Sequence, residues 1–153
     1  MDVVALGELL IDFTENGVSN QGNPLFEANP GGAPCNVLAM LSRLGHKTAF
    51  IGKVGNDFFG KQLEDAIKEV GIDAAGLLKD DEVHTTLALV HTQANGDRDF
   101  SFYRNPGADM MLTENEIPEA VIRDARIFHF GTLSMTHEMV RKATKKAIAL
   151  AKE

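Results

Sequence analysis

The chain has 153 residues, of which 44% are hydrophobic and 24% charged, and it carries a formal net charge of -7. These values fit one globular domain and disfavour nucleic acid and anionic membranes as partners. The single cysteine excludes an internal disulfide and indicates a reducing compartment, for which we take the cytoplasm. No apolar run approaches the ~20 residues of a membrane span, and the first residues do not have the pattern of a secretory signal.

The chain opens with a predicted buried strand. Residues 3–6 form a continuous apolar run, which is typical of a strand covered on both faces of a parallel sheet. Glu8 and Asp12 follow among apolar residues, where a carboxylate needs hydrogen-bond partners or a ligand. Asp12 is therefore either a turn residue at a strand end or a carboxylate that binds a ligand.

Two adjacent glycines, Gly31 and Gly32, follow a polar, turn-rich stretch and open a predicted helix that ends near Leu44. A glycine has no Cβ, so a ligand can touch its main chain, and Pro34 suits the first turn of a helix. The stretch is either a tight turn into a helix or a site where backbone N–H groups and the Asn36 side chain hold a ligand.

A second predicted strand over 48–54 leads to a second helix, which Asp57 caps and Gly71 closes. The order strand, helix, strand, helix predicts a parallel α/β sheet with right-handed crossovers. Residues 55–61 between them spell G-x-x-x-x-G-K, the phosphate loop of P-loop NTPases. Gln62 replaces the Ser or Thr that holds Mg²⁺ there, which favours an ordinary turn and cap.

The pattern then changes to a predicted β-hairpin. Strands over 85–92 and 99–104 flank Asn95-Gly96, a strong hairpin-turn signal. Such a hairpin does not fit a parallel core, so with residues 14–30 it predicts a small separate sheet, either a lid over a site or a dimer contact. Arg104 is either a solvated strand end or a donor that reaches a ligand oxygen from this sheet.

The remaining residues return to the core pattern. Thr113 and Glu116 have capping-box spacing, and Pro118 suits a helix start. Residues 126–131 have the character of a buried strand, and Thr136 is expected to cap the last helix, which in an α/β fold feeds another parallel strand. The histidines show no metal-ligand spacing and the cysteine has no partner base, so we assign neither a metal site nor a reactive thiol.

Three motifs stand out in chain order: Gly7–Phe13; Gly31–Asn36 with Gly45 and Gly52–Gly60; and Phe102–Met110. Together they cover most of the chain and resemble the ribokinase-like (PfkB) carbohydrate kinases. The first motif matches the family's first strand and sugar-binding aspartate, the second its first signature, and the third its fructokinase branch. Leu38 departs from the first signature, which expects a small residue there, and this is a packing difference within the first helix.

The resemblance implies a Rossmann-type α/β core, a parallel sheet flanked by helices, with a small β-sheet lid that closes over the sugar and often forms the dimer contact. We place the core at about residues 1–13, 31–83 and 109–153, and the lid at about 14–30 and 84–108.

The resemblance also implies roles for individual residues. Asp12 would accept hydrogen bonds from sugar hydroxyls. Gly31 and Gly32 would bring the main chain close to the sugar, Asn36 would bind it through its side chain, and Arg104 would contact it from the lid. We expect a homodimer formed through the lid.

The family's catalytic base is an aspartate in a Gly-Ala-Gly-Asp motif, which does not occur in this sequence. We therefore assign no catalytic residue and expect the C-terminal half, with the base and most of the ATP site, to be absent. The prediction is part of an ATP- and Mg²⁺-dependent fructokinase, in which a sugar hydroxyl attacks the γ-phosphate, and which is inactive as this chain alone. The alternatives are a kinase for 2-keto-3-deoxygluconate, ribose or a sugar phosphate, a non-catalytic sugar-binding module, and a P-loop NTPase.

Overall fold

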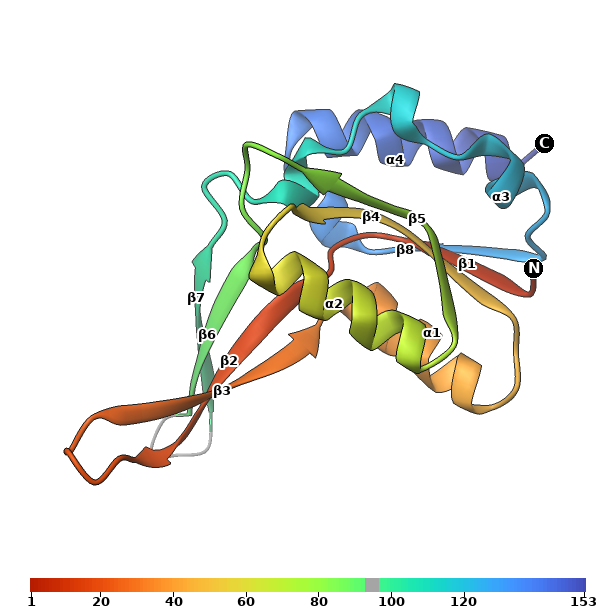
Figure 1. The fold of residues 1–153 in the computed structure, drawn as a ribbon. Helices are drawn as coiled ribbons and strands as arrows, with labels where there is room; N and C mark the ends of the chain where they lie inside the picture. Colours follow the sequence, from red (N-terminus) through yellow and green to blue (C-terminus); the bar gives the residue numbers. More distant parts are fainter. Residues whose placement is uncertain (93–96) are drawn as a thin grey trace.

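The computed structural model describes residues 1–92 and 97–153, so the predicted Asn95-Gly96 turn lies outside the described residues (Figure 1). Its core is a four-stranded sheet in the order β5-β4-β1-β8. All three neighbouring pairs in this sheet are parallel, which confirms the predicted α/β class. The strands are β1 (Val3–Leu6), β4 (Thr48–Gly55), β5 (Ile72–Asp80) and β8 (Ile127–Phe130).

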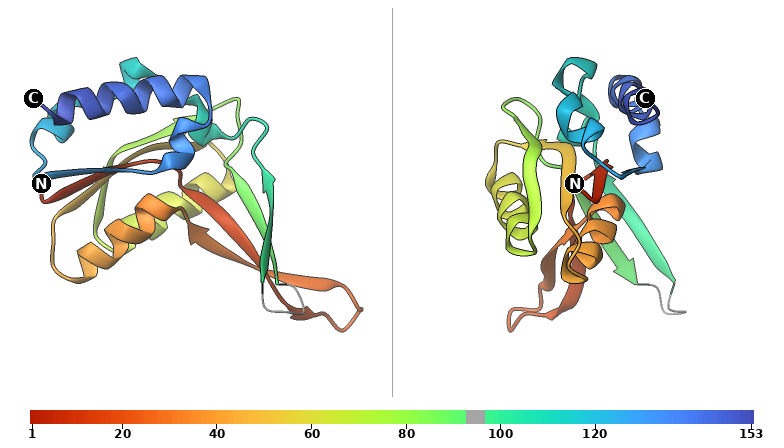
Figure 2. Two further views of the ribbon diagram at one scale, coloured as in Figure 1. Left: turned by 180° about the vertical axis from the view of Figure 1, so that it is seen from behind. Right: turned by 90° about the vertical axis from the view of Figure 1, so that its right-hand side faces the viewer.

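Helices cover both faces of this core sheet (Figure 2). Alternate residues of β1 pack on opposite sides, because successive side chains of a strand point to opposite faces. Val3 and Ala5 join the cluster with α1 and α2, whereas Val4 and Leu6 join the cluster with α4. The helices are α1 (Ala33–Arg43), α2 (Phe58–Glu69), α3 (Glu119–Arg123) and α4 (Glu138–Ala151). No helix in the described part of the chain is long and apolar enough to cross a membrane.

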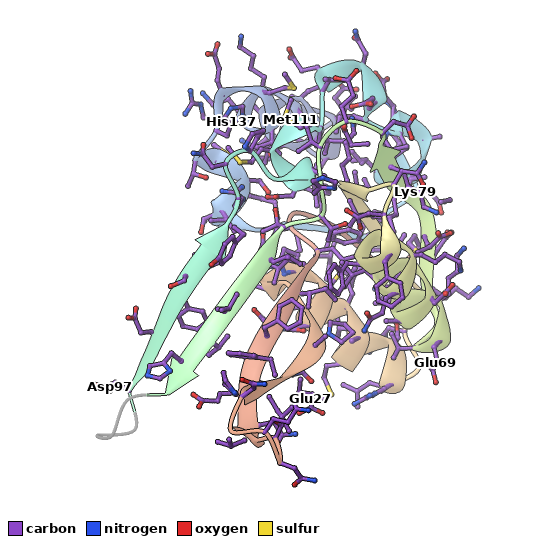
Figure 3. The ribbon with its side chains drawn as sticks, turned by 60° about the vertical axis from the view of Figure 1, so that its left-hand side comes forward. Glu27, Glu69, Lys79, Asp97, Met111 and His137 are labelled. Carbon is purple, nitrogen blue, oxygen red and sulfur yellow. The ribbon has the colours of Figure 1, made fainter. Side chains whose placement is uncertain are left out.

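A second sheet of four strands, here called the small sheet, extends from one end of the core (Figure 1). Its order is β3-β2-β6-β7, with antiparallel outer pairs and a parallel central pair. In Figure 3, Glu27 and Asp97 lie toward its far end, away from Met111 and His137 on the core. The strands are β2 (Leu10–Val18), β3 (Pro24–Gly31), β6 (Leu87–Thr92) and β7 (Arg98–Tyr103). The small sheet therefore includes Asp12 and begins before residue 14.

Several local signals are confirmed. Asp57 caps α2 by accepting a hydrogen bond from the Gly60 N–H at 2.8 Å. Thr113 and Glu116 form the capping box of the short 3-10 helix η2 (Glu114–Glu116). Gly71 has a φ of 84° just beyond α2, the left-handed conformation that glycine adopts readily at a helix end.

Three expectations about elements were wrong or incomplete. The sequence analysis missed β5, an edge strand whose apolar pattern is broken by polar residues. Strand β8 is not buried: it is last in the sheet order, and Ile127 is 58% exposed. Thr136 does not cap α4, because the short 3-10 helix η3 (Thr132–Met135) ends there and the Thr136 hydroxyl donates to the Leu133 carbonyl at 2.7 Å.

Candidate functional site

Asp12 and Gly31 lie in direct contact. On paired strands β2 and β3, Asp12 is opposite Asn29 and Leu10 is opposite Gly31, so the Asp12 and Gly31 positions share one face. A Cβ added to Gly31 would stand 2.1 Å from Asp12 Oδ2. Any side chain at this position would therefore have to displace the Asp12 carboxylate.

The Asp12 carboxylate is half-buried and has no hydrogen bond or ion pair within the described residues. This partial burial raises its pKa above the ordinary value, because the charged form loses water without gaining a partner. A carboxylate in this state is ready to accept hydrogen bonds from a ligand.

Gly32 has a different reason to be glycine. Its φ is 121°, and a Cβ there would lie 2.3 Å from the Glu8 carbonyl oxygen. The Gly32 carbonyl then accepts from the Asn36 N–H at 3.0 Å and begins α1. The tight turn into a helix is therefore real, and it holds the main chain of the glycine pair against the segment after β1.

Asn36 is exposed in the first turn of α1. With Gly31 it lines a groove of about 420 Å³ between α1 and α2, whereas Asp12 is not among the residues that line it. The structure thus joins Asp12 to Gly31 and Gly31 to Asn36, but it does not place all three around one cavity.

Arg104 follows the end of β7 and is not a solvated strand end. Its Nε and Nη2 donate to Asp109 Oδ2 at 2.8 and 2.6 Å, and its Nη1 donates to Thr136 Oγ1 at 3.3 Å. The Arg104 side chain is 11% exposed and that of Asp109 is 3% exposed. This is a largely buried, forked ion pair, which the sequence analysis did not foresee.

Glu8 is a second residue whose role the sequence analysis left open. It is 5% exposed, and its Oε1 accepts from the Ala33 N–H at 3.0 Å at the start of α1. Its Oε2 is buried without a hydrogen-bond partner among the described residues. Burial raises the pKa of Glu8, the nearby Asp109 charge adds to this, and the Arg104 charge opposes it.

The backbone N–H groups of the two glycines in the G-x-x-x-x-G-K loop are bonded within the chain. Its Gly60 N–H donates to Asp57, and its Gly55 N–H donates to Thr85 Oγ1 at 3.0 Å. A Cβ on Gly60 would lie 1.9 Å from the Gly55 carbonyl oxygen, and Lys61 pairs with Asp65 on α2. These N–H groups are already used, so the loop does not fit the phosphates of a nucleotide.

The side chains that commonly bind metal ions do not cluster in the described part of the chain. Within residues 1–92 and 97–153, no three or more His, Cys, Asp and Glu side chains are grouped so that they hold a metal ion.

The fold and this site define the class of protein. The model of the pfkB family carbohydrate kinases matches residues 1–153, and the chain belongs to this family. It is 47% identical over 153 residues to the fructokinase of Solanum tuberosum, an alignment that covers 99% of this chain and 48% of that relative. The chain thus spans about half the length of the curated relatives it matches.

Solved structures show the same likeness. The fructokinase from Xylella fastidiosa superimposes with a TM-score of 0.91 and 35% identity, covering 98% of this chain and 47% of that one. A putative ribokinase II from E. coli in complex with ATP and Mg²⁺ has a TM-score of 0.89 and 27% identity, covering 99% of this chain and 49% of its own. Membership of this family makes a P-loop NTPase untenable.

Proposed function

We propose that this chain is the sugar-holding part of an ATP-dependent sugar kinase whose acceptor is fructose. The observation that carries the proposal is the contact between Asp12 and Gly31. The Asp12 carboxylate is half-buried, has no hydrogen-bond or ion-pair partner among the described residues, and lies against a backbone that carries no side chain. The fructokinases among the relatives support the choice of sugar.

In this proposal each site residue has a separate task. Asp12 accepts hydrogen bonds from sugar hydroxyls, which are stronger when the acceptor is charged. Gly31 and Gly32 let the sugar approach the backbone, and the exposed Asn36 amide adds a side-chain bond. Arg104 carries more N–H donors than its contacts with Asp109 and Thr136 use, so part of its fork remains for the sugar.

The small sheet is proposed to act as a lid, with the rest of the chain as the core. It is also proposed to form a homodimer with a second copy. The support is a set of exposed aromatic side chains on β7: Phe100 and Phe102 are 47% and 52% exposed and stack at 6.1 Å, and Tyr103 is 64% exposed. We place the protein in the cytoplasm, which fits its buried, unpaired cysteine.

ATP and Mg²⁺ are proposed as the phosphoryl donor and its metal ion in the whole kinase. When bound, they would supply the γ-phosphate and neutralise its charge. The N–H groups of Gly55 and Gly60 in the loop at 55–61 are already bonded within the chain, and the described residues hold no group of three or more His, Cys, Asp or Glu side chains that could hold a metal ion. We therefore place them, with the catalytic base, on the further length that the relatives have.

The test is a calorimetric titration of this chain with fructose, ribose and 2-keto-3-deoxygluconate, followed by a phosphorylation assay with ATP and Mg²⁺. We expect fructose to bind tightest and no sugar to be phosphorylated. Tighter binding of the sugar acid 2-keto-3-deoxygluconate would mean that Arg104 binds a carboxylate and that fructose is not the phosphoryl acceptor. Phosphorylation by this chain would contradict the proposal that the catalytic base and the ATP site lie outside it. If no sugar binds, the proposed sugar site is wrong.

A phosphorylation assay on a longer protein of the same gene would distinguish a kinase from a non-catalytic sugar-binding module. The kinase proposal expects fructose phosphorylation by that protein, whereas a binding module expects fructose binding without transfer.

A further inference from the structure

Asp109 is a buried carboxylate at the base of the small sheet, in the short 3-10 helix η1 (Ala108–Met111), and it is 4% exposed. Its Oδ2 receives the two shortest contacts from the Arg104 fork, and its Oδ1 accepts from the Thr86 hydroxyl at 2.5 Å. A forked guanidinium–carboxylate pair fixes orientation as well as distance. Asp109 therefore holds both of its partners in defined positions.

These contacts join two of the four crossings between the core and the small sheet. Thr86 precedes β6 and Arg104 follows β7, and beside them the Ala108 N–H donates to the His84 carbonyl at 2.9 Å. Gly107 packs between the two segments, since a Cβ there would lie 1.8 Å from Thr86 Oγ1 and 2.9 Å from Arg104 Cγ. The two segments are as close as a bare backbone permits.

The other two crossings are joined through Glu8. This residue follows β1, and it accepts from the Ala33 N–H where the chain leaves β3 for α1. The charges of Asp109 and Arg104 act in opposite directions on the pKa of Glu8, Asp109 raising it and Arg104 lowering it. Through these hydrogen bonds, Asp109, Arg104, Thr86 and Glu8 together touch all four crossings.

We propose that Asp109 is a positioning residue for sugar binding. By holding Arg104 and Thr86 it fixes the small sheet on the core, and so determines where Arg104 presents its remaining N–H groups to a sugar. The sugar-binding part of this inference rests on the proposed function.

The first test measures the position of the small sheet without any sugar. Nitroxide labels at Asn20→Cys and Lys145→Cys, both exposed positions, report the distance from the tip of the small sheet to α4 by pulsed electron resonance, and Cys35 is buried. We expect one narrow distance in the parent chain and in the control Asp99→Asn, an exposed carboxylate on β7. Asp109→Asn should broaden it, and an equally narrow, unshifted distance would overturn the proposal.

The second test measures fructose affinity and thermal stability in Asp109→Asn, Arg104→Gln and the double variant. We expect each single change to weaken binding by about tenfold or more, and the double variant to bind no worse than either. The double variant should be more stable than Asp109→Asn, because Arg104 is no longer buried without its counter-ion. A purely structural role predicts that affinity follows stability across the series, and that result, or unchanged affinity in folded Asp109→Asn, would contradict the inference.

The two failures are distinguishable. If the parent chain binds no sugar, the proposed function fails, and the labelled distance still decides whether Asp109 fixes the small sheet.

Discussion

The charge of Asp12 lowers the stability of the fold, because folding removes water from the carboxylate and no described residue supplies a partner in return. The sequence already marks both partners of its contact with Gly31, because the carboxylate and the glycine pair each belong to a recognisable motif. The Arg104–Asp109 pair could not be predicted in the same way. Arg104 lies in a loop and Asp109 in a 3-10 helix of four residues, both too short for any periodicity to tell which side chains meet. Glu8 likewise finds its partner in a residue 25 positions away.

We predict that Asp12→Asn stabilises the fold near neutral pH while weakening fructose binding. The folded pKa of Asp12 is raised above 3.8, so the penalty for its charge is absent at lower pH and develops as the pH rises through the folded pKa. Thermal unfolding should therefore show a midpoint higher by about 1–3 °C at neutral pH, with no difference near pH 3. Asp99→Asn serves as the surface control. A lower midpoint for Asp12→Asn at neutral pH would show that the carboxylate has a stabilising partner.

At the scale of elements, the pattern of apolar residues was sufficient where a strand or helix is buried on a regular face. The strand predicted at residues 3–6 is β1, and the predicted cap Asp57 is the N-cap of α2. The pattern failed at the edges of the core sheet, where β5 carries charged residues near both of its ends and β8 is only partly buried. Edge strands have only part of their surface covered, so their sequences carry a weaker apolar signal.

Two substitutions at the start of α2, Asp57→Ala at the cap and Lys61→Ala on the helix, test the G-x-x-x-x-G-K segment. Asp57 accepts from the backbone N–H groups of Gly60 and Thr85, and these bonds hold the pKa of Asp57 below its ordinary value although partial burial opposes them. Asp57→Ala should lower the free energy of unfolding by about 1–2 kcal/mol, measured in urea. Lys61→Ala should leave both this free energy and fructose affinity unchanged, because Lys61 pairs only with an exposed neighbour on its own helix. A large loss of sugar affinity in Lys61→Ala would restore a ligand role for the loop.

At the scale of the whole molecule, the chain has a core covered by helices on both faces and a small sheet attached through four crossings. The buried carboxylates Glu8 and Asp109 lie at those crossings, and in our proposal Asp109 connects sugar binding to the position of the small sheet. Strand β8 is the last strand in the described order of the core sheet, and Ile127 on it is exposed. The general architecture was predictable from the order of elements, whereas the relative placement of two sheets depends on side-chain contacts between distant residues.

The most direct measurement is nuclear magnetic resonance of this chain, labelled with ¹⁵N, during a titration with fructose. The account predicts that the amide signals of Gly31 and Gly32 shift in proportion to the bound fraction, and that Asp12→Asn removes these shifts while the rest of the spectrum stays folded. Shifts that leave both glycine signals in place, or that persist unchanged in Asp12→Asn, would contradict it.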